Sequence, residues 1–270
     1  MLLKIIDEHQ VRAIYNSKVK LFKDGSMHGV HWSYNVEKGR VQQQTCHKGT
    51  STQEELENYA KKHLKRCKSN IIDIALNNCS QFQYFITLTF NSNEFPNGIY
   101  THDYAIMLLS KWLHNQRQRN KDMCYLVVPE FHKSGRLHFH GLVGNVPKWK
   151  LIEAINSKTR KPIKENGLQI YNLLNYKLGF TTLSIIQDKE KVSNYIAKYA
   201  TKELIDLKFK KRYWYSKNLQ LPKTEYLYLE DNDTLLDEWL FSKSFVTFYT
   251  QIEKENSKIE VLRSVPIKQD

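Results

Sequence analysis

The sequence predicts an α+β protein whose strands pair in an antiparallel sheet. The chain has 270 residues, of which 41% are hydrophobic, so it can bury a substantial core. Strand-like and helix-like patterns follow one another in the order strand, helix, strand pair, strand, helix, which is typical of this class. We expect strands at 82–90, 124–131, 135–143 and 181–186, and helices at 103–120 and 188–205.

The first third of the chain predicts strands followed by a basic helix. Residues 18–22 and 29–34 have strand-like patterns, with a turn at Asp24-Gly25 between them. Thr52 and Glu55 have the spacing of a capping box and predict the start of a long helix. This helix carries several lysines and arginines, which form a solvated face or contact phosphates.

The middle of the chain supplies the central strands. Residues 82–90 are rich in β-branched and aromatic residues and predict a strand with Thr87 and Thr89 on one face. Residues 148–176 have a mixed, helix-like pattern. After the strand at 181–186, Asp188 can cap the last clear helix.

A His-Phe-His run is the most informative feature. His138 and His140 flank Phe139 in a strand of alternating polar and apolar residues, so both imidazoles point to one face, about 7 Å apart along the backbone. At that spacing the two side chains can bind one metal ion. An isolated pair of this kind is more often just polar residues on a solvated strand face.

Glu130 can complete a metal site with the two histidines. A hairpin between 124–131 and 135–143 places this carboxylate opposite them, whereas we expect the turn to carry His132 away. Two imidazoles and one carboxylate leave positions open for water and substrate oxygens. Such a site suits Mg²⁺ or Mn²⁺ when the substrate is a phosphate.

The last clear helix carries two tyrosines four residues apart. Tyr195 and Tyr199 share one helical face, and each is followed three residues later by a lysine, Lys198 and Lys202. A free tyrosine has a pKa near 10, and a neighbouring ammonium group favours the phenolate that a nucleophile requires. Tyrosines at this spacing are otherwise more often packing residues.

The charge of the chain indicates a polyanionic partner. Its 41 lysines and arginines exceed its 28 acidic residues, which gives a formal charge of +13 and favours nucleic acid. No apolar run approaches the roughly 20 residues that span a bilayer, so we expect no membrane partner. A basic cluster with interleaved aromatic residues can bind single-stranded DNA, or can pack by its aromatics with its cations in solvent. The cluster contains Lys208, Lys210, Lys211 and Arg212.

Three motifs in this order resemble those of the HUH endonucleases, and most closely those of the rolling-circle replication initiators of single-stranded DNA phages and small plasmids. They are Phe-Ile-Thr-Leu-Thr-Phe at 85–90, His-Phe-His at 138–140, and Tyr-x-x-Lys-Tyr-x-x-Lys at 195–202. The resemblance implies a central five-stranded antiparallel sheet flanked by helices, with the histidine strand near its centre.

On this basis the chain divides into an N-terminal extension of strands plus a basic helix (1–80), a nicking endonuclease core (81–206) and a basic, aromatic C-terminal extension (207–270).

The resemblance also implies an activity. A divalent metal held by the two histidines and Glu130 polarises a scissile phosphate, and one of the tyrosines attacks it, leaving a 5′-phosphotyrosine link and a 3′-hydroxyl. The second tyrosine permits a second cleavage while the first strand stays attached, as closing a circle requires. The expected partners are a single-stranded DNA origin, with or without a hairpin, a host DNA polymerase and a host helicase. Because no P-loop sequence occurs, unwinding of the duplex must come from a host enzyme or from supercoiling. The expected location is the cytoplasm of a bacterial host.

Other functions account for parts of the pattern. A paired-tyrosine transposase or a conjugative relaxase would use the same chemistry. A nonenzymatic DNA-binding regulator of replication needs the charge but gives no role to intact histidines and tyrosines. A non-haem iron oxygenase also uses two histidines and a carboxylate, but gives no role to the tyrosines or the charge.

Overall fold

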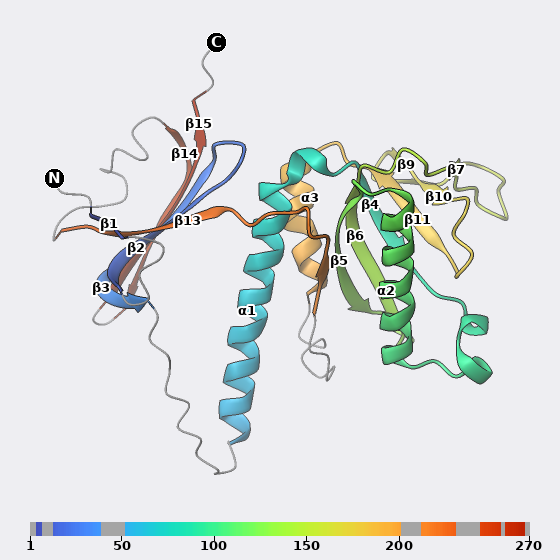
Figure 1. Cartoon of the computed structure of the whole chain (residues 1–270), viewed down its shortest axis with the longest axis horizontal. Coiled ribbons are helices and arrows are strands. Elements are labelled where there is room, and N and C mark those ends of the chain that lie inside the picture. The colour runs from blue at the N-terminus through green and yellow to red at the C-terminus, as the bar shows by residue number, and fades with distance from the viewer. Residues whose placement is uncertain are drawn as a thin grey trace. The chain divides into compact units, whose positions relative to one another are not determined.

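The computed structural model describes residues 4–6, 13–38, 52–200, 212–230, 244–254 and 257–267. The chain forms two compact units, one of residues 51–221 and one of residues 1–50 together with 222–270 (Figure 1). The first unit is therefore inserted in the sequence between the two segments of the second. The division based on sequence placed its boundaries at residues 80 and 207 instead.

The unit of residues 51–221 is built on a seven-stranded sheet with the order β12-β5-β6-β4-β11-β10-β7, in which each neighbouring pair is antiparallel. The α+β class and the antiparallel central sheet are therefore confirmed. Five strands were expected, and the short strands β12 and β7 extend that row at its two edges. The strands are β4 (Tyr84–Leu88), β5 (Cys124–Phe131), β6 (Leu137–Gly144), β7 (Leu151–Glu153), β10 (Tyr171–Leu173), β11 (Thr181–Ile185) and β12 (Trp214–Tyr215).

The expectation of a helix-like segment at 148–176 is wrong. This segment contains β7, a small hairpin of β8 (Lys164–Glu165) and β9 (Leu168–Gln169), and β10. Strands of two or three residues are too short to show a period of two in the sequence, so their pattern could not be told from that of a helix.

Three α-helices in the described residues begin at side-chain caps. Helix α1 (Gln53–Asn77) starts at the predicted capping box, in which Thr52 and Glu55 bond each other's backbone. Helix α2 (His102–Arg119) is capped by Thr101, and α3 (Lys189–Ile196) by Asp188, as predicted. No helix in the described ranges is long and apolar enough to cross a membrane.

Helices cover both faces of the seven-stranded sheet (Figure 1). Helix α2 packs with Phe139 of β6 in the hydrophobic cluster on one face, whereas α1 and α3 pack with Leu142 of β6 in the cluster on the other. Because successive side chains of a strand point to opposite faces, His138 and His140 share the face of Leu142, which α1 and α3 cover.

The unit formed by both terminal segments contains a six-stranded antiparallel sheet with the order β1-β13-β2-β3-β15-β14. Its apolar cluster includes Val19, Met27, Leu227 and Leu262. The strands are β1 (Lys4–Ile6), β2 (Ala13–Leu21), β3 (Met27–Lys38), β13 (Lys223–Tyr228), β14 (Ser244–Lys254) and β15 (Ser257–Pro266).

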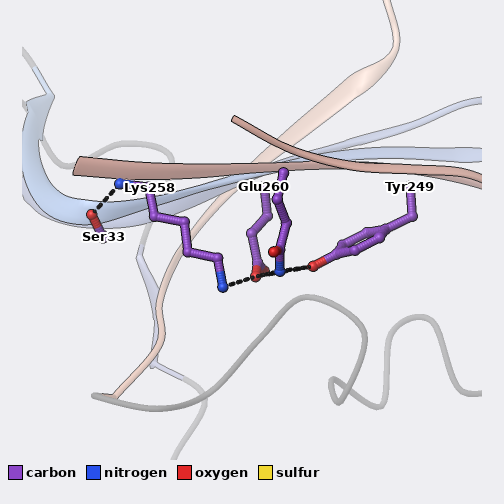
Figure 2. A network of polar contacts seen from close by, with 5 residues as sticks. Ser33, Tyr249, Lys258 and Glu260 are labelled. Atoms are coloured by element: carbon purple, nitrogen blue, oxygen red, sulfur yellow. Dashed lines mark hydrogen bonds and ion pairs between the residues drawn. The ribbon is translucent and has the colours of Figure 1, made fainter. Parts of the chain in front are cut away.

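A polar network lies on this second sheet (Figure 2). The carboxylate of Glu260, a residue only 1% exposed, accepts hydrogen bonds from the Tyr249 hydroxyl at 3.1 Å and the Gln251 amide at 3.0 Å. The Lys258 ammonium lies 3.2 Å from the same oxygen, and the Lys258 backbone N–H donates to the Ser33 hydroxyl at 2.8 Å. A buried carboxylate is tolerated here because it has three donors.

Candidate functional site

The histidine strand and the Glu130 strand form the expected hairpin. In the β5–β6 register Glu130 lies opposite His138, and the turn closes with the His132 N–H donating to the Arg136 carbonyl at 2.8 Å. Gly135 has a φ of +77° in this turn, a conformation that other residues adopt only with strain. The hairpin therefore fixes which side chains face each other across the two strands.

His140 is held on all sides. It is 7% exposed, its Nε2 lies 2.8 Å from the Glu130 carboxylate, and its Nδ1 lies 3.0 Å from the Thr87 hydroxyl of β4. The ring of Tyr199 stacks on the imidazole, with centroids 3.7 Å apart and planes at 16°. Burial lowers the pKa of His140, although hydrogen bonding to Glu130 opposes that shift, so the neutral, ligand-competent imidazole is favoured.

His138 projects from the same face but has a different neighbour. Its ring centroid lies 6.4 Å from that of His140 and 4.5 Å from that of His132, on which it stacks at 9°. Burial and the nearby His132 lower the pKa of His138. The expectation that the turn carries His132 away is wrong, because the closed turn brings this ring back over β6.

The donor groups of a divalent-metal site are adjacent but not arranged as a closed cluster. Two neutral imidazoles and a carboxylate on neighbouring strands match the ligand types that such ions accept. In this structure the Glu130 carboxylate bonds to His140 directly. Within the described ranges, no group of three or more His, Cys, Asp or Glu side chains is positioned to hold a metal ion. The chemistry of these residues fits a metal, and their arrangement would have to open to admit it.

The two tyrosines lie beside the histidines. Tyr195 is in the last turn of α3, whereas Tyr199 ends a 3₁₀ turn at Ala197–Tyr199 that follows it. The Tyr199 hydroxyl donates to the Tyr195 oxygen at 2.8 Å. Phe85 of β4 contacts both rings, at centroid distances of 5.7 and 6.1 Å. The first residue of the predicted 85–90 motif thus supports both tyrosines.

Burial raises the pKa of Tyr199, and its hydrogen bond to Tyr195 adds to that effect. The sequence had suggested that a lysine three residues on favours the phenolate. Lys198 instead places its ammonium over the face of the Tyr195 ring, 4.7 Å from the centroid. Lys202 lies outside the described residues, as do Lys208, Lys210 and Lys211.

A cavity of about 680 Å³ opens beside Tyr195. It lies between α3 and the strands β9 and β11, and its wall includes Phe85, Ile185 and Leu168. Lys191 and Lys198 also line it. Asp188 and Glu165 line it as well, and the Lys191 ammonium pairs with Asp188 at 3.0 Å. The cavity therefore combines apolar surface with charges of both signs next to an exposed phenol.

Sequence reasoning missed three contributors to this site. The role of Thr87 could have been suspected, since its face of β4 was predicted, but its pairing with His140 depends on the β4–β6 register. Phe85 appeared only as part of a motif. His132 was assigned to the turn, and nothing in the sequence signals its stacking on His138.

The fold and the site define an α+β protein with a histidine hairpin and a tyrosine pair on one face of an antiparallel sheet. Residues 83–204 match the family model for the replication-associated protein ORF2. The matched segment includes β4, the hairpin and both tyrosines. No significant match is found among curated proteins or solved structures. This segment, which is less than half of the chain, is therefore similar to a family of replication-associated proteins.

Proposed function

We propose that this protein initiates rolling-circle replication by nicking and rejoining single-stranded DNA at an origin, with a tyrosine as the nucleophile. The observation that carries the proposal is the contact chain from His140 to Tyr199 at 3.7 Å between rings, and from Tyr199 to Tyr195 at 2.8 Å between oxygens. Through these contacts, two candidate nucleophiles lie directly beside candidate metal ligands, an arrangement that packing alone does not require.

The proposed step is an in-line displacement at phosphorus. The phenol oxygen bonds to the scissile phosphorus, the bond from phosphorus to the 3′ oxygen breaks, and a 5′-phosphotyrosine forms. The phenol loses one proton and the leaving 3′ oxygen gains one, so no co-reactant is required. The phosphotyrosine retains the energy of the broken bond, and attack by a 3′-hydroxyl rejoins the strand.

His138, His140 and Glu130 are the residues that would hold Mg²⁺ or Mn²⁺, and the ion would supply positive charge at the scissile phosphate. The protein itself contributes the orientation of the ligands. Thr87 and Glu130 occupy both nitrogens of the His140 ring, and Tyr199 covers its face.

We infer that Tyr195 attacks first. This residue is 42% exposed, so a DNA strand can approach it, and its oxygen accepts the hydrogen bond from Tyr199. A donor at that oxygen stabilises the developing phenolate. Tyr199 is more buried and keeps its proton as the donor during the first cleavage. It is therefore the tyrosine that remains available for the second cleavage.

The proposed substrate contacts extend from this pair. The 680 Å³ cavity beside Tyr195 takes a nucleotide flanking the scissile phosphate, and Lys198 pairs with the phosphate itself. The released 3′-hydroxyl primes a host polymerase, and a host helicase opens the duplex. Because the reaction depends on these host enzymes, we place it in the bacterial cytoplasm.

A covalent-adduct assay tests this function. The full chain is mixed with Mn²⁺ and pooled single-stranded oligonucleotides that tile the replicon, and the products are separated on a denaturing gel. We expect an adduct that EDTA abolishes and that the Tyr195→Phe, Tyr199→Phe double variant does not form. With substrate limiting to one turnover, Tyr195→Phe alone should remove most of the adduct and Tyr199→Phe should slow it.

The matched control is Tyr34→Phe, which removes a phenol of similar exposure (46%) from the other unit. It should form the adduct at the wild-type rate. If no tile yields an adduct while the chain still retards DNA in a mobility shift, the nonenzymatic regulator is the better description and the nuclease proposal fails.

A further inference from the structure

A second cavity, outside the tyrosine site, lies between helix α1 and strand β12. Its volume is about 340 Å³. Arg66 and Asn70 line it from α1, and Arg212, Tyr213 and Tyr215 line it from the segment that contains β12. Among the described residues that line this cavity, none is acidic. Its size is that of a site for one small polar ligand rather than for a protein segment.

Arg66 and Arg212 both line this small cavity. His63 and Cys67 of α1 also line the cavity, and Arg212 and Arg66 both disfavour a positive charge on His63, adding to the burial that lowers its pKa. The same two arginines partly offset the burial that raises the pKa of the Cys67 thiol. Their positive charges therefore converge on the cavity, which favours an anionic ligand.

Two tyrosines form the aromatic wall of the cavity. Trp214 is buried in the cluster on the α2 face of the sheet, so Tyr213 and Tyr215, on either side of it, project to the α1 face. The two tyrosine rings stack, with centroids 5.9 Å apart and planes at 21°. Tyr213 accepts a hydrogen bond from Asn70 at 3.4 Å, whereas Tyr215 is 38% exposed. Tyr215 thus presents a partly exposed aromatic surface that is backed by the ring of Tyr213.

Strand β5 links this cavity to the tyrosine site. Its Val127 pairs with Trp214, and its Glu130 bonds to His140. Three residues of an extended strand span about 10 Å. Both sites are on the face of the sheet covered by α1 and α3, a short distance apart along β5.

We propose that this cavity binds one nucleotide of a single-stranded nucleic acid, with its base on Tyr215 and its phosphate between Arg66 and Arg212. Stacking on an aromatic ring accepts any base, so the site would hold the strand without reading its sequence. The inference does not rest on cleavage, because a protein that only binds single strands would use the site in the same way.

The test measures binding of the full chain to fluorescent oligo-dT by anisotropy at several salt concentrations. Tyr215→Ala should weaken binding by about 5- to 150-fold, the range for loss of one stacked base, with an unchanged salt slope. Arg66→Ala should weaken binding and reduce the salt slope by about one, as loss of one phosphate contact does. The melting temperature of each variant checks its fold.

Lys65→Ala is the matched control, since it removes the same charge from the neighbouring, exposed position of α1 and does not line the cavity. We expect it to bind within twofold of wild type. Equal losses from Lys65→Ala and Arg66→Ala, or wild-type binding by Tyr215→Ala, would overturn the proposal. Displacement of the oligonucleotide by micromolar dTMP would overturn the strand assignment in favour of a free nucleotide. If no covalent adduct forms but binding of oligo-dT still depends on Tyr215, the result would contradict the proposed nuclease activity and leave the nucleotide site supported.

Discussion

Single residues outside the histidine motif determine how that motif is presented. His140 has both ring nitrogens occupied, Nδ1 by the Thr87 hydroxyl and Nε2 by Glu130. The partner of the nitrogen that does not bind metal fixes the tautomer and orientation of a histidine ligand. Thr87 is therefore expected to be the positioning residue for His140, whereas Glu130 is itself a ligand candidate.

Thr87→Val should reduce Mn²⁺-dependent adduct formation by about 10- to 100-fold, the usual effect of losing a partner of a metal ligand. The readout is a Mn²⁺ titration, in which the half-saturating concentration should rise, and Thr87→Ser should restore it. Thr89→Val is the control, because the Thr89 hydroxyl donates to the Phe180 backbone instead. Equal effects from the two valine variants would contradict the assignment.

The residues that carry the proposed chemistry could be predicted from the sequence, but the contacts between them could not. The alternation around Phe139 and the spacing of Tyr195 and Tyr199 indicate which side chains share a face. The stacking of Tyr199 on His140 and of His132 on His138 depends instead on how α3 and the hairpin turn close over the sheet. No local periodicity contains that information.

Elements joined by short connections were predicted far better than elements paired across the chain. The β5–β6 hairpin has a short turn, and its strands show their patterns directly. In the second sheet, β13 lies between β1 and β2, and the Asn16 side chain bonds the backbone of Leu229, 213 residues away. Such pairings cost loop entropy that only the assembled sheet offsets, so local sequence does not reveal them.

The network around Glu260 should stabilise the second sheet. Glu260→Ala leaves Tyr249, Gln251 and Lys258 without their shared acceptor, and we expect a loss of about 2–4 kcal/mol in the free energy of unfolding. Glu260→Gln keeps an acceptor and should lose about half as much. Urea unfolding followed by circular dichroism measures both. Glu253→Ala, at an exposed position of β14, should change little, and a comparable loss there would argue against a special role for the network.

The stability of the same sheet should fall at acidic pH because of His28. Burial lowers the pKa of His28 to about 4, helped by Arg263 and Lys20 on the neighbouring strands and opposed by Asp24. The unfolded chain protonates this residue below about pH 6.5, whereas the folded chain does not until about pH 4. The resulting stability is complete above pH 6.5 and is lost as the pH falls toward 4.

His28→Gln should therefore flatten the pH dependence of unfolding in that window, by about 1–2 kcal/mol once solvent screening of the half-buried ring is allowed for. Urea titrations of the wild type and the variant at pH 4.5 and pH 7 measure the difference. Identical pH profiles would show that His28 does not contribute.

At the scale of the whole molecule, the two units differ in how they are built from the sequence. All described residues of the tyrosine site, both hydrophobic clusters of the seven-stranded sheet and the Tyr215 cavity belong to the continuous stretch 51–221. The other unit needs both terminal segments, because β13 and β15 pair with β2 and β3. One unit is thus built from a single stretch of chain, whereas the other is built from two.

A fragment of residues 51–221 should accordingly fold alone and form the Mn²⁺-dependent adduct within about tenfold of the full-chain rate on a short oligonucleotide. The reason is that its core and its reacting groups are complete, and a domain of this size buries enough surface to be stable. Circular dichroism with thermal melting, followed by single-turnover adduct formation, tests both parts. Since the formal charge of the whole chain is +13, its affinity for DNA should fall steeply with salt, and the fragment should show a smaller salt slope wherever the removed unit also contacts phosphates. A folded fragment that forms no adduct, while the full chain does, would place an essential part of the site in the terminal segments and contradict the assignment of the reaction to the inserted unit.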